Sequence, residues 1–198
     1  MTSHVPHAHS PQQMRTLSNV GHWVEGTIIA GAGSVLLRDA LAGDGSSSQT
    51  ASTVLAGAGT LLGVALVGGS FEHGGPAQFF RADHQQREHL EMATLLTAGG
   101  LARRFGRVGK ILGSAATARI GQMFLTHEQH GTGEAAAVAK GKHEMLGKTI
   151  LGAAATSAIG DLFDLKALRA VGAALLVLSG LQLVAYREPE GAYEPDGR

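Results

Sequence analysis

The sequence predicts an all-α protein, an integral membrane bundle of six helices arranged as three antiparallel hairpins. Charged residues make up 16% of the 198 residues, well below the roughly 25% of a typical soluble domain. The apolar segments are rich in Ala, Leu and Gly, and they lack the alternating β-branched pattern that is typical of strands. Residues 53–71 and 170–186 carry no charged residue, and about 20 apolar residues suffice to span a bilayer.

Six apolar segments are expected to form the helices: residues 23–41, 53–71, 90–102, 111–125, 145–159 and 170–186. They divide the chain into a polar His-containing tail (1–20), a helical domain (21–187) and a polar C-terminal tail (188–198). The tail 1–20 has no pattern of a cleaved signal peptide. The three middle segments are short enough to be buried helices of a soluble bundle. Together with the low mean hydropathy of +0.09, they keep a soluble helical bundle open as an alternative.

The helices are expected to pair into hairpins over residues 22–75, 89–131 and 143–187. Each hairpin opens with a His followed closely by a Glu, and each closes on a short polar stretch. The opening residues are His22, His89 and His143. This recurrence indicates an internal repeat of helical hairpins.

The third hairpin carries a resemblance. It opens with His143 and closes with the sequence YREPEGAY, Tyr186 to Tyr193. In this it resembles uncharacterised bacterial polytopic membrane proteins built of helical hairpins with an opening His and a similar tail. The resemblance implies an integral membrane location, with a loose association with copper handling or membrane electron transfer. The first hairpin departs from the pattern, so no functional residue is carried over.

The distribution of basic residues predicts the orientation. Seven lie in the turns within the three hairpins: Arg38, Arg103, Arg104, Arg107, Lys110, Lys166 and Arg169. The positive-inside rule places these turns in the cytoplasm and both termini on the other side of a bacterial inner membrane. All ten His are then expected on the non-cytoplasmic side, where imidazole and carboxylate groups could bind a metal.

Two sets of candidate site residues follow. Imidazoles and carboxylates near the closing stretches are candidate metal ligands: His127, His130, Glu128, His73 and Glu72. The three opening residues, His22, His89 and His143, are candidate cofactor ligands, because a haem b needs two His from different helices at similar depth. The cofactor expectation is therefore copper or haem b, against the simpler interpretation that these His mark a membrane interface.

Residues inside the apolar helices predict helix contacts. Arg119 is expected to pair with a Glu or with a partner protein, because a charge within a membrane helix usually has a partner. Glu25 lies near a helix end and is expected to reach the outer surface. Gly59 and Gly63 are four apart on one face, which allows a neighbouring helix to approach closely.

Composition and motifs limit the possible functions. The absence of Cys excludes disulfides and thiolate metal sites, and 16 basic against 16 acidic residues argue against nucleic-acid binding. No P-loop, nucleophile elbow or metalloprotease motif is present. The sequence therefore favours a non-enzymatic multi-pass protein. It is expected to be an accessory or structural subunit that packs against other membrane subunits of an electron-transfer complex. The alternative is a copper- or haem-binding membrane protein.

Overall fold

The computed structural model describes residues 10–42, 45–72, 84–126, 133–190 and 192. This part of the chain contains six helices and no strand, which confirms the all-α prediction. The helices are α1 (Pro11–Ala42), α2 (Gly45–Glu72), α4 (His84–Ala102), α5 (Gly106–Thr126), α6 (Glu134–Leu162) and α7 (Lys166–Ala185).

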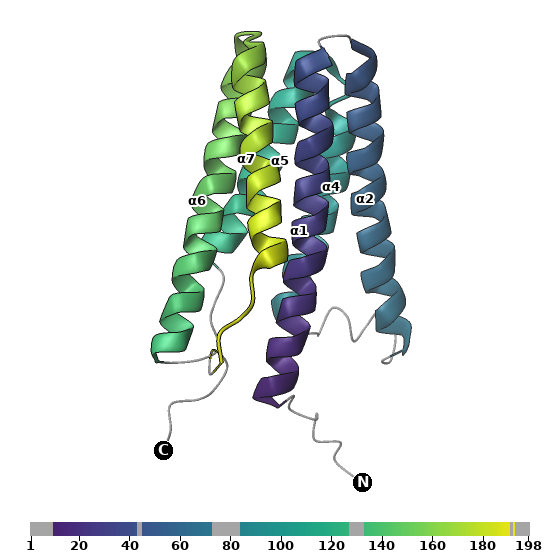
Figure 1. Cartoon of the computed structure of the whole chain (residues 1–198). Coiled ribbons are helices and arrows are strands. Elements are labelled where there is room, and N and C mark those ends of the chain that lie inside the picture. Colours follow the sequence, from purple (N-terminus) through teal and green to yellow (C-terminus); the bar gives the residue numbers. More distant parts are fainter. Residues whose placement is uncertain (1–9, 43–44, 73–83, 127–132, 191, 193–198) are drawn as a thin grey trace.

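The six helices form a closed ring. Each helix packs against its neighbours in sequence, and α7 packs back against α1. The helices run alongside one another, and α1 and α6 begin at the same end of the bundle (Figure 1). The end of α1, the start of α2 and the turn between α6 and α7 lie at the opposite end. The ring closes because α1 and α7 are in contact, and the most extensive contacts, α1 with α7, α5 with α6 and α2 with α4, join helices of different predicted hairpins.

Helix α1 begins earlier than the sequence analysis expected. The Ser10 hydroxyl accepts a hydrogen bond from the Gln13 backbone N–H (3.3 Å), and the Gln13 side chain accepts one from the Ser10 N–H (2.9 Å). This is a capping box, and Pro11 occupies the first helical position, where a missing N–H costs nothing. Residues 11–20, expected in a tail, are thus the first turns of α1.

Glycines set the closest helix contacts. A Cβ added at Gly26 of α1 would lie 2.6 Å from the Gly180 carbonyl oxygen of α7, and one at Gly59 of α2 would lie 2.6 Å from the Thr97 nitrogen of α4. A Cβ at Gly63 would stand 3.8 Å from Ala93, an ordinary contact. The expected close approach therefore occurs at Gly59, whereas Gly63 leaves room for a side chain.

The core fills the centre of the ring with aliphatic side chains from all six helices, among them Ile29, Leu55, Leu96, Ile150 and Leu176. They surround a cavity of about 40 Å³. This cavity is far smaller than the roughly 300–1,000 Å³ of a ligand pocket.

The turn end of the ring contains a buried cation. Arg103 was expected to lie with its basic neighbours at a membrane surface, but its side chain is directed inward and the residue is only 8% exposed. Burial lowers the pKa of Arg103, while the nearby carboxylates of Asp161 and Asp39 act in the opposite direction. Arg104 instead donates to Ser52 (3.1 Å) and Thr53 (2.9 Å) on α2. The basic turn therefore also binds helices together.

Two further expectations can be compared with the structure. The expected partner of Arg119 is Glu91 of α4, with Nε–Oε1 at 2.6 Å, which confirms that prediction. Two helices, Ser18–Ala42 within α1 and the whole of α7, are long and apolar enough to cross a membrane, a property that core helices of soluble proteins share. Within the predicted membrane segment 53–71, the side chains of residues 65–71 lie outside the described part of the chain.

Candidate metal centre

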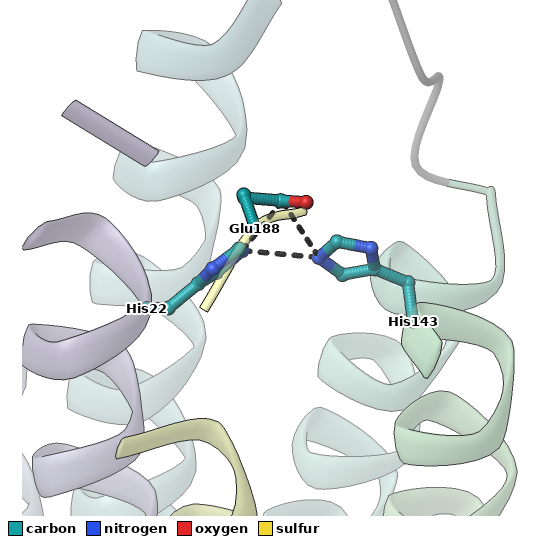
Figure 2. Close-up of side chains that lie close together, drawn as sticks. All are labelled: His22, His143 and Glu188. Carbon is teal, nitrogen blue, oxygen red and sulfur yellow. Dashed lines mark hydrogen bonds and ion pairs between the residues drawn. The ribbon is translucent and has the colours of Figure 1, made fainter. Parts of the chain in front are cut away.

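Two imidazoles and a carboxylate meet inside the bundle, towards the end at which α1 and α6 begin. His22 of α1, His143 of α6 and Glu188 after α7 point toward one another (Figure 2). The two Nε2 atoms are 3.0 Å apart, and Glu188 Oε1 lies 3.8 Å from His22 Nε2 and 4.0 Å from His143 Nε2. The three residues are 6%, 2% and 1% exposed. Three good metal-ligating atoms therefore face a common point away from solvent.

His143 is held in one orientation by its own helix. Its Nδ1 donates to the Ala139 carbonyl oxygen, one turn earlier in α6, at 3.0 Å. A carbonyl oxygen can only accept, so the proton of the neutral ring lies on Nδ1 and the lone pair lies on Nε2, directed at the cluster. Phe124 of α5 stacks on the ring with centroids 6.3 Å apart. Such backbone support of the second nitrogen is typical of metal-binding His.

Glu188 lies in an extended segment after α7, residues 186–190, which we call the strap. The strap is fixed to the first turns of α1, because the Glu188 N–H donates to Asn19 Oδ1 at 2.8 Å and Arg15 Nε donates to the Glu188 carbonyl oxygen at 3.0 Å. The side chain accepts from the Tyr186 hydroxyl (3.0 Å) and the Ser18 hydroxyl (3.3 Å). These bonds hold the carboxylate against the two imidazoles.

The distances are close to those of a mononuclear metal site. With metal–nitrogen bonds of about 2.0–2.1 Å, tetrahedral ligand atoms lie roughly 3.3 Å apart. The observed 3.0, 3.8 and 4.0 Å need shifts of several tenths of an ångström. A haem would need its iron and porphyrin between the two His rings, whose centroids here are 5.0 Å apart with Glu188 beside them. A single ion therefore fits the cluster better than a haem.

A second pair lies beside the cluster. Glu25, one turn after His22 on α1, accepts from His89 Nε2 of α4 at 2.9 Å. Glu25 is 8% exposed, so it lies inside the bundle, and the expectation that it reaches the outer surface is wrong. The reason is that His89 on the facing helix provides a polar partner within the bundle.

The predicted site residues thus divide into three groups. The structure brings His22 and His143 together and places His89 in the neighbouring pair with Glu25. Glu72 is the last residue of α2, and its side chain lies outside the described residues. The remaining candidates, His73, His127, Glu128 and His130, also lie outside the described part of the chain.

Sequence reasoning missed Glu188, because residues 188–198 were expected to be a polar tail, and it missed Tyr186, because that residue was expected to end the sixth apolar helix. A signal was present in the closing sequence YREPEGAY, which mixes an aromatic residue with acids after the last helix. Nothing in the sequence shows, however, that this segment folds back onto α1.

Fold and site together describe an all-α bundle with a buried His–His–Glu cluster. No protein-family description, curated protein or solved structure matches this chain. The function must therefore be argued from the site itself.

Proposed function

We propose that this protein binds one divalent transition-metal ion through His22, His143 and Glu188. The observation that carries the proposal is the convergence of three buried metal-ligating atoms from α1, α6 and the strap within 4.0 Å. Residues so far apart in sequence form a nearly solvent-free polar cluster only if its groups satisfy one another or bind an ion.

The ligand types favour a particular class of metal. Two imidazoles with one carboxylate suit zinc, iron(II), cobalt(II) or nickel(II), whereas copper(I) prefers thiolate and thioether ligands. The protein has no Cys. Three protein ligands also leave an open coordination position for water or a small ligand, as in zinc sites that are not purely structural. Of the two expected cofactors, copper and haem b, the proposal therefore sets haem b aside and keeps copper only as copper(II), one of the divalent ions that imidazole suits.

The proposal also places the bundle in a membrane. It is supported by the two helices of sufficient length and apolarity and by large apolar side chains on the outside of the ring, including Leu61 (72% exposed), Val64 (64%) and Val108 (69%). Such a surface is suited to lipid tails or to the apolar helices of another membrane subunit. The basic turns would then face the cytoplasm and the metal site the opposite side.

Metal titration of the purified full-length protein tests the binding proposal. Zinc should bind with a stoichiometry of one at the tight site, and cobalt should give an absorption spectrum of low-symmetry, nitrogen–oxygen coordination. The variants His143→Ala and Glu188→Gln should lose more affinity than the roughly 10–100-fold that follows loss of an outer-shell partner.

Glu190→Gln is a matched control, because its carboxylate lies on the same strap and its side chain is 91% exposed. It should bind zinc like the wild type. Equal affinities for Glu188→Gln and Glu190→Gln, or a wild-type protein that binds no zinc or cobalt, would overturn the proposal.

Fractionation tests the membrane location separately. The protein should stay with alkali-washed membranes and enter mild detergent. Recovery in the soluble fraction with zinc binding intact would remove the membrane location and leave the metal site. Co-purification with other membrane subunits in detergent would support the accessory-subunit role, and a lone monomer would count against it.

A further inference from the structure

Glu25 and His89 form a pair whose geometry supports a further inference. Glu25 Oε1 and His89 Nε2 are 2.9 Å apart, a short, charge-assisted distance if the ring is protonated. Imidazole and carboxylate are the same two ligand types that form the buried cluster.

The pair lies directly next to the buried cluster. Glu25 follows His22 by three residues on α1, so the two side chains share a face and lie about 4.5 Å apart along the helix axis. The His89 ring also lies against Gly21 of α1, because a Cβ added at Gly21 would lie 3.5 Å from His89 Nε2. An ion held by the pair would therefore be one helical turn from the buried ligands.

Exposure separates the pair from the buried ligands. The strap is bonded to Arg15, Ser18 and Asn19 of α1 beside those ligands. The side chains of the buried ligands are at most 7% exposed, whereas the His89 side chain is 28% exposed. His89 is therefore a metal-ligating group that contacts both solvent and Glu25 of α1.

We infer that Glu25 and His89 form an outer, weaker metal position that takes a divalent ion from solvent and passes it to His22, His143 and Glu188. This inference rests on the proposed function. In the absence of metal the two side chains hydrogen-bond to each other. With an ion present, His89 Nε2 and a Glu25 oxygen bind it instead, and water completes the coordination. Two protein ligands bind more weakly than three, which allows the ion to leave for the inner position.

Zinc loading of the full-length protein tests the inference, with calorimetry for stoichiometry and stopped-flow mixing for rate. The wild type should bind two zinc ions, one tight and one weak. Glu25→Gln and His89→Ala should lose the weak ion and keep the tight one. They should also fill the tight site more slowly than the wild type.

Glu91→Gln is the matched control, since it removes a carboxylate from the same helix as His89 but one that pairs with Arg119. Helical circular dichroism identifies variants that fold. One bound zinc and unchanged loading in folded Glu25→Gln and His89→Ala would overturn this inference while leaving the proposed function intact. Loss of the tight ion in either folded variant would also overturn it, because the pair would then belong to a single site. A wild type that binds no zinc would instead defeat the proposed function.

Discussion

The contact between α1 and α7 closes the ring. Replacing Gly26 by Ala tests whether this contact requires a residue without a side chain at position 26. The new Cβ would lie 2.6 Å from both the Gly180 oxygen and the Val184 nitrogen of α7, whereas ordinary contacts begin at 3.4 Å. Both groups belong to the backbone and cannot rotate away. The two helices must therefore separate by roughly 0.8 Å, a form of overpacking that costs about 1–3 kcal/mol.

A second substitution in the same helix isolates that cost. A Cβ at Gly31 would meet nothing within 4 Å, so Gly31→Ala should show only the helix-propensity gain of up to about 1 kcal/mol. Gly26→Ala has the same gain and the packing cost in addition. The free energy of unfolding of Gly26→Ala should therefore be lower than that of Gly31→Ala by about 1–3 kcal/mol.

Thermal unfolding followed by circular dichroism in mild detergent measures the difference. Each kcal/mol corresponds to about 2–4 °C for a chain of this size, so Gly26→Ala should melt several degrees below Gly31→Ala. Equal melting temperatures for the two variants would refute the reasoning, because they would show that α1 and α7 do not approach as closely as Gly26 and Gly180 indicate.

Two further predictions concern the strap and the α2–α4 contact. Zinc should slow tryptic cleavage after the exposed Arg187, because an ion on Glu188 holds the strap against α1. Glu188→Gln should remove this protection. If zinc protects Glu188→Gln as well as the wild type, Glu188 is not a metal ligand. Gly59→Leu should lower the free energy of unfolding by more than the roughly 1–3 kcal/mol of a modest overpacking, because a Cβ at this position already meets Thr97 and Ala93. Gly63→Leu should lower it less. The unfolding midpoints of the two variants in detergent test this order, and the reverse order would be inconsistent with the structure.

The sequence alone determined the all-α class and the number of helices. Apolar segments rich in Ala, Leu and Gly, separated by polar stretches, predicted six helices, and six are observed among the described residues. Their bounds differ, since α1 begins at Pro11 and α6 at Glu134. The charge in the fourth segment predicted a Glu partner, and Glu91 fills that position. The opening residues His22, His89 and His143 lie inside α1, α4 and α6 rather than at their first residues.

Tertiary structure decided which of those residues meet. His22 and His143 lie on α1 and α6, and no spacing along the chain shows that the ring places α1, α6 and the strap around one point. Glu188 completes the cluster only because the chain after α7 folds back onto Arg15, Ser18 and Asn19. Glu25 and Arg103 are buried for the same reason, since their partners come from helices distant in sequence. Local sequence fixes helix formation through short-range preferences, whereas a site assembled across the ring depends on packing between segments that only the folded chain brings together.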